Sequence, residues 1–318
     1  MSKNFALTGV SGYVAPRHLR AIRDTGNRLV AAVDPNDSAG IIDSFFTDVR
    51  FFTEFERFDR HIEKLRRKND ENRVHYVSIC SPNYLHDAHA RFALRVGADA
   101  ICEKPLVLNP WNIDALAELE RESGHRIYTV LQLRVHPPLV ALREKLLESK
   151  GSSKREVCLT YITARGPWYL VSWKGQAERS GGLVTNIGIH FFDLLMWFFG
   201  GVESWEVHMA EPTRTAGFLE LERARVKWFL SINDEDIPAG LKKVNQRTCR
   251  SITIDGDEVE FSGGFTDLHT IVYQEILAGR GFGLDEARPS IQLVHDIREA
   301  ERIGFTANVH ALAERFKK

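Results

Sequence analysis

The sequence has little cysteine and no excess of charge of either sign. Four cysteines occur in 318 residues, with neither a Cys-x-x-Cys pair nor the Cys and His spacing of a metal site: Cys80, Cys102, Cys158 and Cys249. They lie in apolar or strand-like stretches, which predicts reduced, buried thiols and no bound metal. The 42 basic and 43 acidic residues give a formal net charge of -1, which provides no electrostatic footprint for nucleic acid or an anionic membrane. A small-molecule partner is favoured instead.

Long hydrophobic runs and a leader sequence are also missing. The amino terminus, MSKNFALTGVSG, has no apolar segment typical of a secretory signal. We find no stretch that approaches the roughly 20 apolar residues of a membrane-spanning helix. We therefore expect a cytoplasmic protein without membrane contact, and the length of the sequence fits two compact domains.

Short apolar runs alternate with helical stretches over residues 1–133. The runs read as strands and are NFALTG, LVAAVD, VHYVSIC, ADAIC and RIYTVLQL, the last of which covers residues 126–133. Continuous apolar strands separated by helices are typical of a parallel sheet covered on both faces. The pattern predicts an α/β, doubly wound (Rossmann) domain over residues 1–133 that binds a dinucleotide.

The pattern changes after this domain. A connecting helix is followed by strand-like stretches, VCLTYITA, VESWEVHM, GFLELE, ARVKWFLSIN, RSITIDG and DEVEFS, with helices predicted at 183–200, 266–279 and 290–304. This order predicts an α+β domain over residues 134–318 with a large, open, mainly antiparallel sheet, for substrate binding and oligomerisation. A sheet face rich in Trp and Phe (ESWEVH, VKWFLS) would be a liability in a monomer, so we expect a symmetric assembly.

The turn after the first predicted strand has features of a dinucleotide site. Gly9 and Gly12 let the backbone approach a pyrophosphate, and a helix beginning near Tyr13 offers free N–H donors. The spacing is Gly-x-x-Gly-x-x-Ala rather than Gly-x-Gly-x-x-Gly, so a tight turn without a ligand is the alternative. Asp34 ends the second strand, where a carboxylate accepts hydrogen bonds from ribose hydroxyls. No Arg or Lys follows in PNDSAG, which favours NAD over NADP.

Polar residues follow two further strands at the same predicted sheet edge, where open parallel sheets bind ligands. One run ends in Ser81-Pro82-Asn83 with His86 beyond it, and the next ends in Glu103-Lys104-Pro105. Helix capping is the alternative role for the serine and the asparagine. The predicted cofactor-binding residues are Gly9, Gly12, Tyr13, Val14, Asp34, Asn36, Ser81, Pro82, Asn83, His86, Glu103, Lys104 and Gln132.

With Glu-Lys-Pro after a dinucleotide fold, the chain resembles the glucose-fructose oxidoreductase/inositol dehydrogenase family. The resemblance implies that Lys104 lies beside the nicotinamide and the reacting hydroxyl, that Glu103 supports it, and that the Lys104–Pro105 bond is cis. The family's second motif is matched by SGGLVTNIGIHFFD. Asn186 replaces the common Asp of that motif and lies four residues before His190, hence on one helix face with it. A core histidine is the alternative role for His190.

The resemblance extends over nearly the whole sequence to one bacterial branch of that family. Stretches such as ITARGPWYLVSWKG, TNIGIHFFD and GFTDLHT are similar to UDP-N-acetylglucosaminuronate 3-dehydrogenases, in which Asn before Gly-Ile-His is usual. The similarity implies NAD-dependent oxidation of the C3 hydroxyl of UDP-2-acetamido-2-deoxy-glucuronate, in the synthesis of lipopolysaccharide O-antigen sugars. It further implies a homotetramer and recycling of NADH by 2-oxoglutarate.

Oxidising an alcohol needs a base for the hydroxyl proton. We expect His190 to be the base and Lys104 to polarise the C3 oxygen, with the reverse assignment left open. A uronate and a diphosphate call for cationic partners, and a uracil for a stacking surface. The expected substrate-binding residues are Lys104, Arg165, Tyr169, Trp173, Lys174, Asn186 and His190. The alternatives are an inositol or simple sugar dehydrogenase and a non-catalytic, dinucleotide-sensing regulator.

Overall fold

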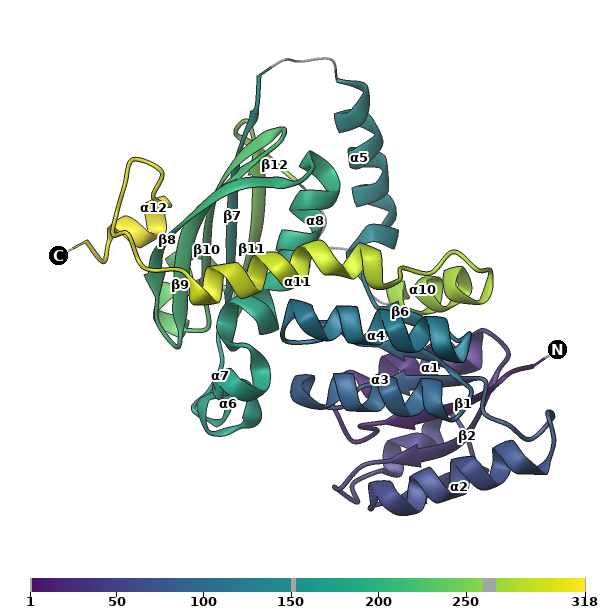
Figure 1. Cartoon of the computed structure of the whole chain (residues 1–318). Helices are drawn as coiled ribbons and strands as arrows, with labels where there is room; N and C mark the ends of the chain where they lie inside the picture. The colour runs from purple at the N-terminus through teal and green to yellow at the C-terminus, as the bar shows by residue number, and fades with distance from the viewer. Residues whose placement is uncertain (1, 150–152, 260–266, 318) are drawn as a thin grey trace. The chain divides into compact units, whose positions relative to one another are not determined.

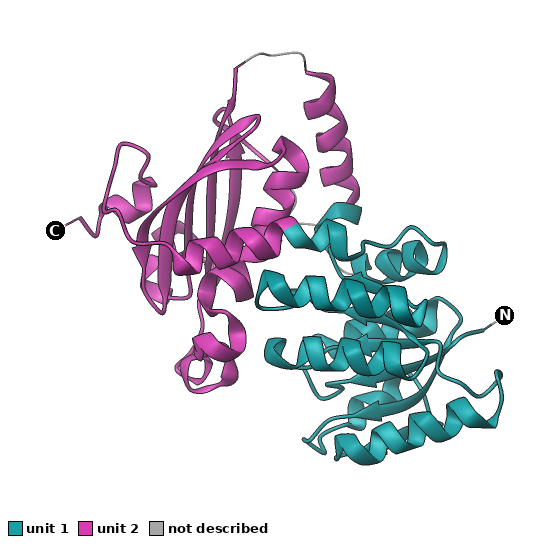
Figure 2. Cartoon of the chain, in the orientation of Figure 1, with its two compact units in different colours: residues 1–135, 264–288 teal, residues 136–263, 289–318 magenta. Residues whose placement is uncertain are grey.

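The computed structural model describes residues 2–149, 153–259 and 267–317 and divides into two compact units, coloured teal and magenta in Figure 2. Unit 1 comprises Met1–Val135 and Gly264–Arg288, and unit 2 comprises His136–Gly263 and Pro289–Lys318. Each unit has its own sheet. The structure differs from the two predicted domains in one respect: the polypeptide returns to unit 1 after most of unit 2, because Gly264–Arg288 belongs to unit 1.

Unit 1 is built on a six-stranded sheet of order β3-β2-β1-β4-β5-β6 in which every pair of neighbouring strands is parallel (Figure 1). All five residues of β1 are buried, as expected for a strand with helices on both faces. The doubly wound prediction is therefore confirmed. The strands are β1 (Asn4–Thr8), β2 (Arg28–Val33), β3 (Arg50–Phe52), β4 (Tyr76–Ile79), β5 (Asp99–Cys102) and β6 (Ile127–Thr129).

The helices of unit 1 pack apolar faces on this sheet, and Phe5, Leu7, Leu19, Ile22 and Tyr273 belong to one core cluster. The α-helices are α1 (Ala15–Asp24), α2 (Phe55–Lys68), α3 (His86–Arg95), α4 (Pro110–Ser123) and α10 (Leu268–Leu277), and the two units share α11 (Leu284–Glu299). Short 3-10 turns are Gly40–Ser44, Asn83–Leu85 and Gln132–Val135.

The strand predicted at 126–133 is too long. The sheet pairing ends at Thr129, and Gln132–Val135 forms a 3-10 turn closed by the N–H of Arg134 and the carbonyl of Leu131, 3.0 Å apart. Leu131 and Leu133 are each 6% exposed. These two leucines are therefore apolar because the turn buries their side chains, although neither residue belongs to the sheet.

Unit 2 contains a second six-stranded sheet of order β12-β11-β7-β10-β9-β8. Only β7 and β10 are parallel among its described pairs, so the sheet is mainly antiparallel, as predicted. Part of the predicted strand at 257–262 lies outside the described residues. The strands are β7 (Arg155–Thr163), β8 (Val202–Ala210), β9 (Arg214–Leu221), β10 (Ala224–Ser231), β11 (Thr248–Ile254) and β12 (Asp257–Glu258).

The helical segments of unit 2 are mostly short. The helix predicted at 183–200 has two parts, a π-helical turn at Val184–Gly188 followed by α8 (Ile189–Phe199). The others are α5 (Pro137–Glu148), α6 (Trp168–Val171), α7 (Ala177–Ser180), α9 (Ala239–Lys243) and α12 (Ala311–Glu314), with 3-10 turns at Trp173–Gly175 and Asp234–Asp236.

Aromatic residues of β10 are buried on both faces of the unit 2 sheet. Trp228 lies edge-on to Phe192 of α8, with ring centroids 5.3 Å apart, whereas Phe229 stacks on His310 near the carboxyl terminus at 5.7 Å. Neighbouring side chains of a strand point to opposite faces, and both of these are fully buried. The expectation of exposed aromatics in VKWFLS is therefore wrong, because the carboxyl-terminal segment covers one face. Trp205 on β8 is 41% exposed.

One helical segment is long and apolar enough to span a membrane, although no such segment was predicted. The helical segment Ala177–Phe199 covers 23 residues and contains an 18-residue part with a mean hydropathy of 1.4. However, 72% of that 18-residue part is buried within the structure. That burial is typical of a core helix, so the stretch is weak support for a membrane span.

Candidate active site

The turn between β1 and α1 depends on two glycines. Gly9 has a φ of +80°, and a Cβ there would lie 2.6 Å from the carbonyl carbon and oxygen of Cys80 and from the amide nitrogen of Ser81. The N–H of Gly12 donates to the carbonyl of Gly9 at 3.1 Å, and a Cβ at Gly12 would lie 3.0 Å from that oxygen. The backbone is therefore bare at both positions, as close approach of a pyrophosphate requires.

The helix after this turn begins at Ala15, two residues later than expected. Val14 occupies its N-cap position, and Tyr13 is 88% exposed, with the Arg17 guanidinium 5.7 Å from its ring centroid. The first turn of α1, all of it described, carries no acidic residue. The N–H groups of Ala15 and Arg17 already donate to the carbonyls of Gly12, at 3.2 Å, and Val14, at 3.0 Å. The positive dipole end of the helix is therefore the feature that suits an anion.

Asp34 follows β2 and organises the neighbouring loop. Its Oδ2 accepts the N–H of Ser11 at 3.0 Å and its Oδ1 accepts the N–H of Asn36 at 2.9 Å. The side-chain hydroxyl of Ser11 donates to the carbonyl of Asn36 at 2.9 Å. A carboxylate offers about four acceptor positions, so two backbone bonds leave capacity for a ribose diol.

The His86 side chain forms hydrogen bonds to both the turn after β4 and the turn after β5. Its Nδ1 lies 2.7 Å from the carbonyl oxygen of Pro105, and its Nε2 lies 2.8 Å from that of Ser81. Burial lowers the pKa of His86, against the two carbonyl hydrogen bonds, which raise it. Beside it, Asn83 is buried and Pro82 is half-buried. The part of these residues in cofactor binding stays a prediction.

Lys104 lies in the turn after β5, and the Lys104–Pro105 bond is cis, as the resemblance implied. The lysine is half-buried, and its backbone N–H donates to Oε2 of Glu103 at 3.3 Å. Glu103 Oε1 lies 3.0 Å from Nε2 of His18 and 2.9 Å from Nε2 of His269. Burial alone would raise the pKa of Glu103, but these two hydrogen bonds outweigh it and hold the pKa well below its usual range.

Gln132 has an unusual amide. Its Oε1 is buried and has no hydrogen-bond partner among the described residues. A buried acceptor left without a partner costs about 1–3 kcal/mol, so the position favours a ligand that donates a hydrogen bond. The bare glycine turn, the Asp34 carboxylate and this amide oxygen together fit a bound dinucleotide.

Two predicted substrate residues meet in unit 2. Asn186 Nδ2 donates to the hydroxyl of Tyr169 at 2.7 Å, and this tyrosine is 3% exposed. Burial raises the pKa of Tyr169, although the bond from Asn186 opposes that rise. The phenol is therefore neutral and free to donate its own proton to a ligand.

Lys174 lies among aromatic rings close to these residues in sequence. Its Nζ is 4.4 Å from the ring centroid of Trp173 and 5.9 Å from that of Trp168. Burial lowers the pKa of Lys174, and the positive charge of Arg165 lowers it further. An anionic ligand would relieve this repulsion between two cations.

His190 is the second residue of α8, directly after the π-helical turn that contains Asn186. The four-residue spacing of Asn186 and His190 predicts that both lie in one ordinary α-helix. That prediction is wrong for Asn186, which lies in the π-helical turn. His190 is half-buried, and Asp193 is 3% exposed. Lys104 belongs to unit 1 and His190 to unit 2, and their joint action is part of the proposal below.

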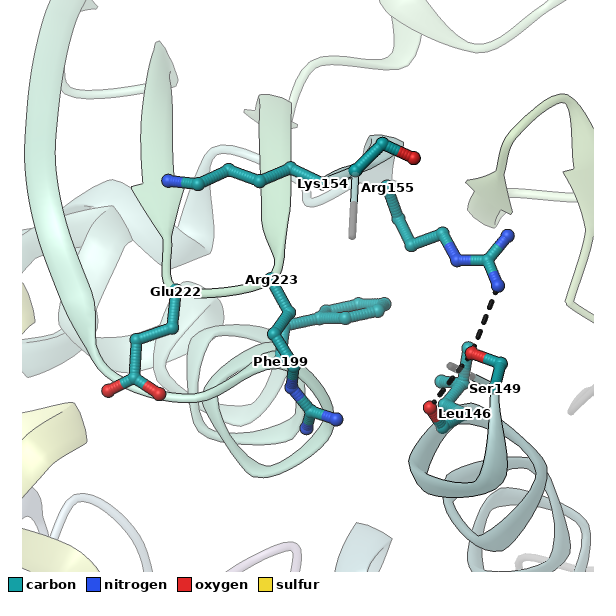
Figure 3. A pocket seen from close by; sticks show the side chains of 8 residues that line it. Leu146, Ser149, Lys154, Arg155, Phe199, Glu222 and Arg223 are labelled. Atoms are coloured by element: carbon teal, nitrogen blue, oxygen red, sulfur yellow. Dashed lines mark hydrogen bonds between the residues drawn. The ribbon is translucent and has the colours of Figure 1, made fainter. Parts of the chain in front are cut away.

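A separate hollow in unit 2 contains none of the predicted site residues. Its lining comprises Leu146, Ser149, Ser153, Lys154, Arg155, Phe199, Glu222 and Arg223 (Figure 3). Two of the three cations there are in ion pairs, since Lys154 contacts Glu203 and Glu220 at 2.6 Å and Arg155 contacts Asp255 at 2.7 Å. The third, Arg223, donates to the carbonyl of Phe198. We therefore do not assign it to the reaction.

Glu103 has two buried histidine partners that no pattern in the sequence indicated. His18 is on α1 and His269 is on α10. Each reads in sequence as a single polar residue on an apolar helix face, which is common for a core histidine. Among the described residues, these two histidines and Glu103 also form a group whose possible ligand atoms lie close enough together to hold a metal ion.

Family models match two parts of the chain. Residues 3–131 match an oxidoreductase family described as an NAD-binding Rossmann fold. Residues 155–237 match a second model, described as the C-terminal alpha/beta domain of an oxidoreductase family. Both models carry the name Gfo/Idh/MocA.

Solved structures are similar over almost the whole chain. The WlbA (WbpB) dehydrogenase of Thermus thermophilus is 54% identical with a TM-score of 0.93, over 97% of this chain and 99% of that one. That protein has been crystallised with NAD and alpha-ketoglutarate, and with NAD and UDP-GlcNAcA. The WlbA dehydrogenase of Bordetella pertussis, 20% identical with a TM-score of 0.76 over 93% of this chain and 94% of that one, shares the fold.

Curated relatives match less of the chain. The 2,7-anhydro-N-acetylneuraminate hydratase of Mediterraneibacter gnavus is 27% identical over 67% of this chain and 52% of that protein. The chain spans 35% and 52% of the length of the first two curated relatives that it matches. The two family matches, the Rossmann sheet and the similarity to the Thermus enzyme show that the chain belongs to the Gfo/Idh/MocA oxidoreductase family, as the resemblance predicted.

Proposed function

We propose that the chain oxidises the C3 hydroxyl of UDP-2-acetamido-2-deoxy-glucuronate to the 3-keto sugar with NAD, in the synthesis of surface-polysaccharide sugars. The observation that carries this proposal is the 54% identity, over 97% of the chain, to a dehydrogenase crystallised with NAD and UDP-GlcNAcA. The motifs around Lys104 and His190 support it. Inositol or simple sugar oxidation is the second candidate, because an inositol 2-dehydrogenase of Rhizobium meliloti is 26% identical over 63% of the chain.

The chemistry assigns roles to two residues. NAD, when bound, accepts the hydride from C3. His190 takes the hydroxyl proton, and the Lys104 ammonium stabilises the negative charge that develops on the C3 oxygen. The reverse assignment stays open, since both side chains can exchange a proton. No metal takes part in this scheme.

The residues of unit 2 supply the partners that a UDP-linked uronate needs. Arg165 and Lys174 provide positive charge for the carboxylate or the phosphates. Trp173 offers a ring face, and the Tyr169 and Asn186 pair offers hydrogen-bond donors. The residues predicted in unit 1 bind the dinucleotide in this proposal, and we propose that the enzyme is a cytoplasmic homotetramer.

Replacing Asp34 with alanine should weaken NAD binding about 10- to 100-fold, because a charged hydrogen bond to the ribose contributes about 1.5–3 kcal/mol. NADP should bind the parent protein poorly, since its 2'-phosphate would face the carboxylate. Isothermal titration with both cofactors measures this. Asp34→Asn, which keeps one acceptor oxygen for the Ser11 or Asn36 N–H, is the control for loop integrity. Equal affinity of the parent for both cofactors would contradict the proposed role.

Supplying UDP-2-acetamido-2-deoxy-glucuronate and 2-oxoglutarate without added NAD should give many turnovers. The protein should retain dinucleotide on purification, and each C3 oxidation should reduce one 2-oxoglutarate to 2-hydroxyglutarate. Two electrons and two protons leave the sugar and enter the keto acid, so the products form in equal amounts. Mass spectrometry of both products checks this.

UDP-N-acetylglucosamine, which lacks the carboxylate, and myo-inositol are the matched comparisons. Turnover with free NAD but no effect of 2-oxoglutarate would remove recycling and leave the dehydrogenase assignment intact. Activity on myo-inositol alone would favour the second candidate. A thermal shift with NADH but with none of the sugars, in the absence of any turnover, would indicate a dinucleotide-sensing regulator.

A further inference from the structure

A series of buried polar side chains runs through the core of unit 1. His269 Nε2 and His18 Nε2 both reach Glu103 Oε1, at 2.9 Å and 3.0 Å. His18 Nδ1 lies 2.7 Å from the hydroxyl of Tyr273, which lies 2.6 Å from the hydroxyl of Ser78. All five side chains belong to residues at most 7% exposed, and three of these residues are fully buried. We name these five residues the Glu103 network.

The donors of this network point toward one carboxylate. An ionised Glu103 can only accept hydrogen bonds, so both Nε2 atoms must carry protons. Burial lowers the pKa of His18, against the hydrogen bond to Glu103, which raises it. A neutral His18 protonated at Nε2 must accept at Nδ1, so Tyr273 donates to it and Ser78 donates to Tyr273. Every buried polar atom along this path then has a partner, which low-dielectric surroundings demand.

The network joins segments that are distant in the sequence. His18 lies on α1, Ser78 on β4, and both His269 and Tyr273 on α10, the helix that returns to unit 1. His269 and Glu103 are separated by 166 residues in sequence. The hydrogen bonds therefore fix the returning helix against the end of β5.

Glu103 connects this network to the turn that carries Lys104. Its second oxygen, Oε2, accepts the backbone N–H of Lys104 at 3.3 Å. Both oxygens are thus engaged, one by the two histidines and the other by the lysine backbone. Rotation of the carboxylate would break at least one of these bonds.

We propose that His18, His269 and Tyr273 are positioning residues that, through Glu103, hold the backbone of Lys104 where its side chain meets the reacting oxygen. This inference rests on the proposed function of Lys104. It predicts a larger effect on the chemical step than on cofactor affinity, because none of the three residues is itself among those assigned to the dinucleotide, although Glu103 and Lys104 are.

A divalent cation is the competing interpretation of the same three groups. His18, Glu103 and His269 place their ligand atoms within 4.8 Å of one another. Metal ligation would require both Nε2 atoms to lose their protons. In the structure both nitrogens lie at ordinary hydrogen-bond distance from a single oxygen, the arrangement that two N–H donors on one carboxylate oxygen produce, and metal analysis of the purified protein tests the alternative.

Tyr273→Phe is the mildest test, because it removes one hydroxyl and keeps the ring that stacks on Phe5 at 5.8 Å. We expect kcat to fall about tenfold, the equivalent of about 1.4 kcal/mol, with a smaller change in KM for NAD. Tyr76→Phe is the matched control, since Tyr76 also stacks on Phe5, at 5.0 Å, and lies outside the Glu103 network. It should leave kcat unchanged.

His269→Leu should lower kcat about 100-fold, the loss that a displacement of about 1 Å at a catalytic group can cause. His269→Gln restores an N–H donor and should recover part of that loss. Selective 15N-histidine NMR supplies a readout other than activity: Nε2 of His18 should be protonated in the parent, and Tyr273→Phe should alter the Nδ1 signal.

The outcomes separate the possible failures. Unchanged kcat in both Tyr273→Phe and His269→Leu would overturn the positioning role. Stoichiometric metal in the purified protein, or a His18 Nε2 without a proton, would overturn the hydrogen-bonded network. If Lys104→Met retains activity, the proposed role of Lys104 fails instead, whatever the NMR spectra show, whereas a parent protein without dehydrogenase activity would contradict the proposed function itself.

Discussion

Replacing Lys104 with methionine is expected to lower turnover by about 10²- to 10⁴-fold, the range that a positioned acid or base contributes. Methionine keeps a flexible side chain of similar length but loses the charge and the hydrogen bonds. The lysine is half-buried, and its backbone N–H donates to Glu103. The substitution removes neither the burial of this position nor that backbone hydrogen bond. The melting temperature should therefore stay close to that of the parent.

NADH formation in a single turnover, recorded beside a thermal melt, measures this effect. Lys64→Met, which removes an exposed lysine of α2, is the control for loss of one positive charge. Near-normal turnover of Lys104→Met would reduce Lys104 to a surface lysine of a sheet-edge turn. A large drop in melting temperature would instead mean that the variant reports on folding.

Gly9→Ala should abolish dinucleotide binding and destabilise unit 1. The new Cβ would lie 2.6 Å from three backbone atoms of Cys80 and Ser81, and no side-chain movement can relieve a clash with backbone. The φ of +80° adds strain for any L-amino acid other than glycine. Relief requires β1 and the turn after β4 to separate, which would displace the N–H groups meant for a pyrophosphate.

Gly26→Ala is a control that introduces the backbone strain of a positive φ without the steric clash that a Cβ makes at Gly9. Gly26 has a φ of +74°, close to that of Gly9, but a Cβ there would have no neighbour within 4 Å among the described atoms. It should cost about 1–2 kcal/mol of stability and leave NAD affinity unchanged. Calorimetry and cofactor titration of both variants distinguish the two effects. Equal behaviour of the two variants would show that the close approach at Gly9 has no part in cofactor binding.

The sequence was sufficient for the architecture of unit 1 because its signals are local. Continuous apolar runs such as the one ending at Thr8 identify buried parallel strands. The glycines, Asp34 and Glu103-Lys104-Pro105 each follow a strand directly, so their common sheet edge could be predicted. The limits of elements were less certain: the run through Leu133 reads as a strand although the backbone turns after Thr129.

Long-range contacts could not be predicted from these patterns. Nothing near His269 indicates that it meets a carboxylate 166 residues away. The π-helical turn before His190 has no local signature either, since the apolar pattern of LVTNIGIHFF suits an ordinary α-helix. The covering of Phe229 by the carboxyl-terminal segment likewise depends on tertiary packing.

The return of Gly264–Arg288 to unit 1 has a consequence for how the protein is made. A ribosome adds about 5–20 residues per second, so α10 follows residue 135 by roughly 7 to 27 s. During that interval the nascent amino-terminal portion lacks Tyr273 against Phe5 and lacks one of the two histidine donors to Glu103. The first unit to be synthesised thus completes its core only after residues 136–263 of the second unit have been translated.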